Sequence, residues 1–227
     1  MRYHPPRLRL KMHTIRLARR LAIKFQLNQI RKLEDRDQPL ERYYKNLLER
    51  KTFSQDSKRY SQSGQDLFAL AMLPQYKDMG TYLEIGSYLP FKHSNTALLE
   101  INGWSGISVE KQNEFVQEFN SARRNHAICA NALDVEYSSV CKPFDLHFDY
   151  CSIDIDPAEQ SYFVLKRIIE SGVKFNSLTF EHDKYRDGPV VQIASYILLK
   201  KHGMTRIEKD VKARGFGSFE DWWIRAN

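Results

Sequence analysis

The feature that most constrains the fold is an alternation of strand-like and helix-like segments, which begins near residue 60. Short runs rich in β-branched and aromatic residues alternate with longer stretches whose apolar residues recur at helical spacing. Such alternation is typical of an α/β fold, in which a parallel sheet carries helices on both faces. The expected strands are residues 82–85, 106–110, 126–130, 148–156 and 177–181, and the expected helices are residues 63–73, 94–102, 113–123, 157–171 and 190–202.

The C-terminal end departs from this pattern. Two strand-like runs, MTRIEKD (204–210) and FEDWWIR (219–225), are joined by the glycine-bearing segment VKARGFGS. Consecutive strands joined by a short glycine-bearing turn pair antiparallel. The sequence therefore predicts a terminal antiparallel hairpin.

The basic character of the chain is concentrated at its N-terminus. Residues 1–60 hold 17 Lys or Arg against 6 Asp or Glu, whereas residues 61–227 hold 18 against 22. Residues 8–30 combine apolar and basic side chains at roughly helical spacing, which predicts a basic amphipathic helix. Such a helix packs on the body or on a partner, or lies on a membrane or acidic glycan surface, or binds nucleic acid. We expect a basic helical extension over residues 1–59 and a catalytic domain over residues 60–227.

Cysteine content and hydropathy point to a cytoplasmic protein, with peripheral membrane contact through the basic helix as an open alternative. Cys129, Cys141 and Cys151 form no even disulfide framework, and each is expected to be a buried free thiol. No apolar run approaches the roughly 20 residues of a membrane-spanning helix.

Acidic residues close the predicted strands. Glu84, Glu110 and Glu181 end three of them, and Asp154 and Asp156 end a fourth. Ligands of open parallel sheets bind beyond the carboxyl ends of the strands. The acids therefore mark this edge as the candidate site, although a single acid at a strand end is often only solvated.

The first strand leads into a turn, EIGSYLP (84–90), that carries a single glycine, Gly86. A pyrophosphate-binding turn needs several glycines and no neighbouring carboxylate, so the turn argues against a dinucleotide. The turn suits a ligand with a positive ammonium or sulfonium group and two ribose hydroxyls. A carboxylate such as Glu110 can accept a hydrogen bond from each of these hydroxyls. S-adenosylmethionine has these groups.

Several motifs together resemble those of the FkbM-like family of class I methyltransferases. They are YSQSGQDLFALAML, GTYLEIGSYLPFKHSNTALLEINGWSGISVEK and FDYCSIDIDPAEQSYFVLK, within a similarity that spans residues 60–223. The resemblance implies a Rossmann-like seven-stranded sheet that ends in the hairpin, and S-adenosylmethionine as the methyl donor. It departs from the family at Pro157, where most members have glycine.

The resemblance also implies cofactor-binding positions. Glu84, Gly86 and Ser87 would shape the pocket around the methionine part, facing Ser94, Asn95 and Thr96 at a helix start. Glu110 would hold the ribose and Lys111 would lie beside the adenine, with Asn131 and Ala132 at the adenine edge. Asp154 would stand next to the sulfonium.

The acceptor side leaves three interpretations open. Asp154, Glu181 and His182 are candidate catalytic residues, because the runs SIDID and FEHD end adjacent strands and histidine can act as a base at neutral pH. Alternatively, Asp154, Asp156, Glu181 and Asp183 bind a divalent metal such as Mg²⁺, or these side chains are structural and solvated. Tyr185, Arg186, Trp222 and Trp223 are further candidates for the acceptor wall, with core packing as the alternative for the tryptophans.

We therefore expect an S-adenosylmethionine-dependent O-methyltransferase acting on a hydroxyl of a sugar, glycan or small polyhydroxylated metabolite. The rival hypotheses are an inactive binding or scaffold protein of the same fold, and a nucleic-acid methyltransferase that uses the basic extension. Nucleic acid is disfavoured because residues 61–227 carry an acidic balance.

Overall fold

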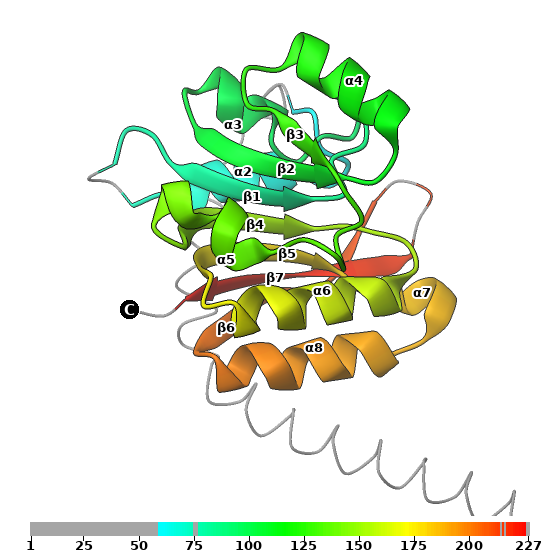
Figure 1. Cartoon of the computed structure of the whole chain (residues 1–227). Helices are drawn as coiled ribbons and strands as arrows, with labels where there is room; N and C mark the ends of the chain where they lie inside the picture. The colour runs from blue at the N-terminus through cyan, green and yellow to red at the C-terminus, as the bar shows by residue number, and fades with distance from the viewer. Residues whose placement is uncertain (1–58, 75–76, 214, 216, 226–227) are drawn as a thin grey trace, which may run out of the picture. The chain divides into compact units, whose positions relative to one another are not determined.

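The computed structural model describes residues 59–74, 77–213, 215 and 217–225 (Figure 1). The predicted amphipathic helix at residues 8–30 lies outside this part of the chain, as does the rest of the expected extension up to residue 58. No helix among the described residues is both long and apolar enough to cross a membrane.

A seven-stranded mixed sheet forms the centre of the protein, with the order β3-β2-β1-β4-β5-β7-β6. The first five strands along the chain pair in parallel, and β7 pairs antiparallel with both β5 and β6. This arrangement is the Rossmann-like fold of class I methyltransferases and confirms the predicted fold class. The strands are β1 (Thr81–Ile85), β2 (Ser105–Glu110), β3 (Ala127–Cys129), β4 (His147–Ile153), β5 (Lys174–Glu181), β6 (Met204–Lys212) and β7 (Ser218–Arg225).

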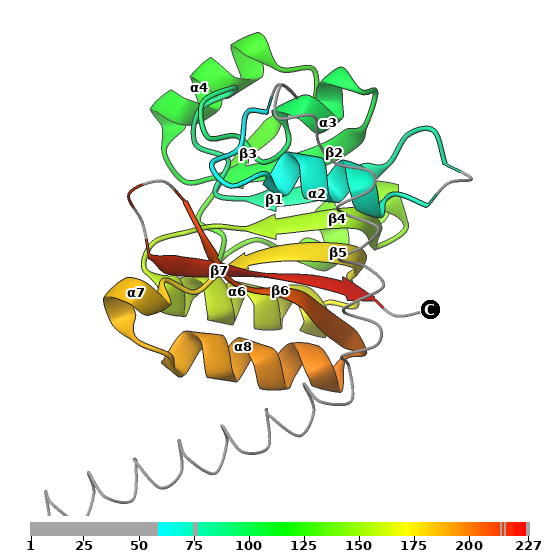
Figure 2. The ribbon, with the colours of Figure 1, turned by 180° about the vertical axis from the view of Figure 1, so that it is seen from behind.

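Helices cover both faces of the sheet, as Figures 1 and 2 show from opposite sides. α2 and α3 lie on one face and α6 and α8 on the other, and α4 follows β2. The α2 face carries a core that includes Phe68, Tyr82, Leu99, Trp104 and Tyr150. The helices are α2 (Gln65–Met72), α3 (Ala97–Ile101), α4 (Asn113–Ala122), α5 (Tyr137–Val140), η1 (Lys142–Phe144), α6 (Ala158–Glu170), α7 (Lys184–Asp187) and α8 (Val190–Lys201).

The structure shifts several predicted boundaries. β4 ends at Ile153, so Asp154 and Asp156 follow the strand instead of belonging to it. α6 begins at Ala158, with Pro157 in the capping position before it. α5, η1 and α7 were not predicted, because each has only three or four residues and is too short to show a helical period.

The two C-terminal tryptophans belong to the core. Trp223 is fully buried, and the ring of Trp222 stacks on Phe68 with 4.8 Å between centroids. Neither lines the cavity described below, so packing is the interpretation that holds for both. Cys141 and Cys151 are buried free thiols as expected, but the expectation was wrong for Cys129, which is exposed at the end of an edge strand.

Candidate functional site

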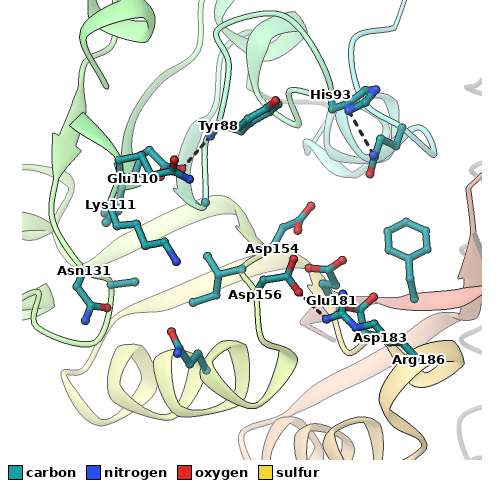
Figure 3. A pocket seen from close by; sticks show the side chains of 18 of the residues that line it. Tyr88, His93, Glu110, Lys111, Asn131, Asp154, Asp156, Glu181, Asp183 and Arg186 are labelled. Carbon is teal, nitrogen blue, oxygen red and sulfur yellow. Dashed lines mark hydrogen bonds and ion pairs between the residues drawn. The ribbon is translucent and has the colours of Figure 1, made fainter. Parts of the chain in front are cut away.

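A cavity of about 360 Å³ opens at the carboxyl ends of the parallel strands (Figure 3). Its size is that of a small-molecule site. The cavity lies beside the neighbouring strands β1 and β4, where the strand order reverses. Open α/β sheets bind their ligands at this topological switch point. Its wall includes Gln62, Gly86, Tyr88, His93, Glu110, Lys111, Asn131, Ala132, Asp154, Asp156, Glu181, Asp183, Tyr185, Arg186 and Phe219.

Gly86 lets two loops meet at the floor of this cavity. Its φ is +85°, and a Cβ atom placed on it would lie 1.9 Å from the carbonyl oxygen of Asp154. Only glycine permits both this conformation and this approach. The single glycine of the predicted turn therefore lets the chain after β1 touch the chain after β4, which closes the cavity floor without a side chain.

Glu84 lies behind this turn and is fully buried. Its carboxylate accepts hydrogen bonds from the hydroxyl groups of Thr96, at 2.8 Å, and Ser108, at 2.7 Å. Burial raises the pKa of Glu84, and the nearby Arg123 guanidinium opposes that effect. Glu84 does not line the cavity, so its observed contacts tie the β1 end to β2 and to the loop that enters α3.

Arg123 is the centre of the same buried network and was missed by sequence reasoning. Its guanidinium donates to the carbonyl oxygen of Pro90 at 2.8 Å, and to the hydroxyl groups of Thr96 and Ser94 at 3.2 and 3.3 Å. It also pairs with Glu100 at 3.3 Å. Arg123 is the last residue of the predicted helix at 113–123, and no local pattern marks it as buried.

Glu110 closes β2 with its carboxylate held in place by the backbone. One oxygen accepts from the Tyr88 amide at 3.2 Å and the other from the Gln112 amide at 2.9 Å. Lys111 and Asn131 line the same end of the cavity in Figure 3. A carboxylate oriented by two amides can accept two further hydrogen bonds, as a ribose diol would supply.

Two acids meet at the middle of the cavity. The carboxyl groups of Asp154 and Glu181 lie close enough to interact directly. The pKa of Glu181 lies far above its usual range, mainly because the group is buried and also because of the nearby charge of Asp154. Glu181 is therefore the protonated partner at neutral pH.

A third acid, Glu220, lies beside this pair and was not predicted. Its Cα is paired with that of Glu181 across β5 and β7, and its side chain is buried. Gln65 and the indole of Trp222 donate to its two oxygens, while burial raises its pKa to about 8.

Arg186 neutralises the remaining acids of the predicted metal group. Its guanidinium contacts Asp156 at 2.5 Å and Asp183 at 2.6 Å. Among the described residues, only His182, Asp210 and Asp221 bring three ligand-type atoms within 4.8 Å of one another. The expected metal set therefore does not bring three ligand atoms together in this arrangement, in which Arg186 pairs with two of its members. Metal binding by these acids stays a prediction.

His182 does not have the position of a general base. Its side chain has no solvent exposure and lies outside the cavity wall, with its ring nitrogen 3.2 Å from Asp221. Asp221 in turn accepts from Arg206 at 2.8 Å, and Lys184 pairs with Asp210 at 2.8 Å. The acids of the cluster formed by His182, Asp210 and Asp221 are thus already paired with basic side chains. The cluster joins α7 to the hairpin. The prediction that His182 serves as the base is not supported by this geometry.

The structure thus divides the predicted site residues into two groups. Those in the cavity wall are Gly86, Glu110, Lys111, Asn131, Ala132, Asp154, Asp156, Glu181 and Asp183. Those behind the wall are Glu84, Ser87, Ser94, Asn95, Thr96 and His182, all of them buried. Asn95 donates to Ser152 at 2.9 Å, whereas the hydroxyl of Ser87 has no hydrogen-bond partner among the described residues. Contact of any of these residues with a cofactor stays a prediction.

The sheet order and the cavity define a class I methyltransferase fold, and comparison with solved structures agrees. An O-methyltransferase from Bacillus cereus in complex with SAH has a TM-score of 0.52 at 13% identity, covering 88% of this chain and 90% of that chain. TomG from Streptomyces achromogenes, an O-methyltransferase involved in tomaymycin synthesis and solved with SAM, has 0.50 at 12%, covering 72% and 79%.

A third similar structure is the fibrillarin pre-rRNA processing protein of Methanococcus jannaschii, with a TM-score of 0.50 at 12% identity, covering 72% of this chain and 76% of that chain. At such identities the likeness shows the fold alone. No protein-family model and no curated protein sequence matches this chain. Membership of the FkbM-like family therefore stays a prediction from the motifs.

Proposed function

We propose that this protein is an S-adenosylmethionine-dependent methyltransferase that methylates a hydroxyl group of a sugar or another polyhydroxylated acceptor. The observation that carries the proposal is Glu110, whose carboxylate two backbone amides orient at the cavity edge. Gly86 adds the floor on which a ligand can lie close to the backbone. Both features fit the ribose and methionine parts of the cofactor.

Four residues of the cavity wall would bind and orient the cofactor. Glu110 accepts hydrogen bonds from the ribose hydroxyls, with Lys111 and Asn131 beside the adenine. Asp154 faces the centre of the cavity, where a carboxylate attracts the sulfonium. The bound cofactor supplies an electrophilic methyl group on sulfur. Acceleration then rests on holding the acceptor oxygen in line with that methyl group.

The proton of the acceptor hydroxyl needs a destination. The raised pKa of Glu181 keeps this residue protonated at neutral pH, so its neighbour Asp154 is the candidate proton acceptor. We therefore assign the proton-accepting role to the Asp154 and Glu181 pair, and a supporting role to His182. The O-methyltransferases among the similar structures favour oxygen as the acceptor atom.

Calorimetric titration with S-adenosylhomocysteine tests the cofactor assignment. We expect micromolar binding by the full-length protein and a loss of at least about thirtyfold in Glu110→Ala, because hydrogen bonds to a charged group contribute roughly 1.5–3 kcal/mol each. Glu118→Ala is the matched control, since Glu118 is exposed on α4 outside the cavity wall. Equal affinities of Glu110→Ala and the wild type would refute the proposed ribose contact.

Turnover assays then separate the rival functions. Methyl transfer to sugars and sugar derivatives supports the proposal. Intact cofactor affinity without transfer to any acceptor favours the scaffold protein. Salt-sensitive RNA binding that disappears on deletion of residues 1–59 favours a nucleic-acid substrate.

A further inference from the structure

We propose that Gln62 and His93 form the acceptor-recognition pair of this cavity and select ligands with neighbouring hydroxyl groups. The inference rests on the proposed function, because it concerns the part of the cavity that the cofactor would leave open. It also gives a role to part of the SQSGQD motif, which the cofactor assignment leaves without one.

The cavity has two ends, which Figure 3 shows on opposite sides. Glu110, Lys111 and Asn131 lie at one end, and His93 lies at the other, with Asp154 between them. A cofactor with its ribose at Glu110 and its sulfonium near Asp154 occupies the first end and the middle. The acceptor must then approach from the end where His93 lies.

Gln62 is held at this cavity by a preorganised loop, residues 60–64. The buried carboxylate of Asp66 accepts from the amides of Tyr60, at 2.8 Å, and Ser61, at 3.3 Å, and from the Ser61 hydroxyl at 2.5 Å. Ser63 donates to the carbonyl oxygen of Lys212 at 3.0 Å, which ties the loop to β6. A binding side chain on a fixed loop loses little entropy when its ligand arrives.

The two side chains contact each other and present complementary hydrogen-bonding groups. The Gln62 Nε2 group lies 3.4 Å from His93 Nδ1. In the tautomer that allows the amide nitrogen to donate, Nδ1 accepts and the ring proton lies on Nε2. In this tautomer the pair offers one acceptor, Gln62 Oε1, and one donor, His93 Nε2–H. A hydroxyl group both donates and accepts, so two neighbouring hydroxyls match the pair.

Aromatic side chains of the cavity wall also suit a sugar ligand. Tyr185 and Phe219 both belong to the cavity wall. Aromatic rings bind the apolar C–H surface of a sugar ring, while the polar pair reads its hydroxyls. A monosaccharide unit carries both kinds of surface.

Saturation-transfer NMR on the full-length protein tests the pair without knowledge of the natural acceptor. The probes are the methyl glycosides of glucose, galactose, mannose and rhamnose, each measured with and without saturating S-adenosylhomocysteine. We expect transfer to at least one glycoside in the wild type, and a reduction of about fivefold or more in Gln62→Leu and in His93→Asn. Asparagine is chosen because His93 has a φ of +56°, which asparagine tolerates.

Gln117→Leu is the control, because Gln117 is exposed on α4 and lies outside the cavity wall. Unchanged affinity of both variants for S-adenosylhomocysteine shows that they remain folded with an intact cofactor site. Transfer to none of the four glycosides, or equal transfer in Gln62→Leu and the wild type, overturns the inference. If the wild type does not bind S-adenosylhomocysteine, the proposed function is refuted instead. This affinity is measured independently of the glycoside signals.

Discussion

The close approach at Gly86 gives the most direct test of the cavity floor, through the substitution Gly86→Ala. Two costs add in this variant. A left-handed conformation costs a residue with a Cβ about 1–2 kcal/mol. The new methyl group would also lie 1.9 Å from the Asp154 carbonyl oxygen, well inside contact distance, so the chain after β1 or after β4 must move. Overpacking of this kind costs about 1–3 kcal/mol, which gives a total of about 2–5 kcal/mol.

Gly172→Ala is the matched control for this experiment. Gly172 has a φ of +86°, but the nearest atom to its added Cβ is Leu146 Cδ1 at 4.0 Å. It should lose only the conformational part, about 1–2 kcal/mol. Urea unfolding of both variants measures the free energies of unfolding, and titration with S-adenosylhomocysteine measures affinity. We expect Gly86→Ala to be the less stable protein and to lose at least tenfold in affinity, while Gly172→Ala keeps it. Equal losses of stability in the two variants would refute the contact with Asp154.

Two further predictions concern buried acids of the hairpin. Glu220 has a pKa raised from 4.5 to about 8, so the folded state binds more protons than the unfolded state between these pH values and stability falls as pH rises. Urea unfolding at pH 5, 6.5 and 8 should show this fall in the wild type and a smaller one in Glu220→Gln; parallel curves would contradict it. Asp221 has a pKa lowered to about 2, mainly by its hydrogen bond to His182 and the charge of Arg206 against the opposing cost of burial. The stability that the Asp221 carboxylate contributes is present above about pH 4 and is lost as pH falls through 2. Asp221→Asn should therefore destabilise the protein by about 3 kcal/mol at pH 7 and by little at pH 2. The same loss of stability at both pH values would show that charge is not the cause.

Local patterns were sufficient for the architecture because strand and helix periods are properties of short segments. The alternation after residue 60 led to the parallel sheet, and the paired terminal runs led to the hairpin. The lone glycine at position 86 and the acids at strand ends located the cavity, since parallel strands deliver their carboxyl ends to one edge.

The direction and partners of each acid were decided by the tertiary structure. Glu84 lies two residues from Tyr82 in β1, so both point to the same face, where Arg123 arrives from the end of α4. His182 directly follows Glu181, yet it is buried outside the cavity wall because its backbone is bound to Phe219 of β7.

The sequence by itself determined the fold class, the turn and the edge of the sheet where the cavity lies. Only the tertiary structure decided which polar residues line that cavity, because their partners are distant in the chain. Gln62 meets His93 across 31 residues, and Gln65 meets Glu220 across 155. Such contacts leave no local pattern, since burial and hydrogen bonding depend on which segments the packed core brings together.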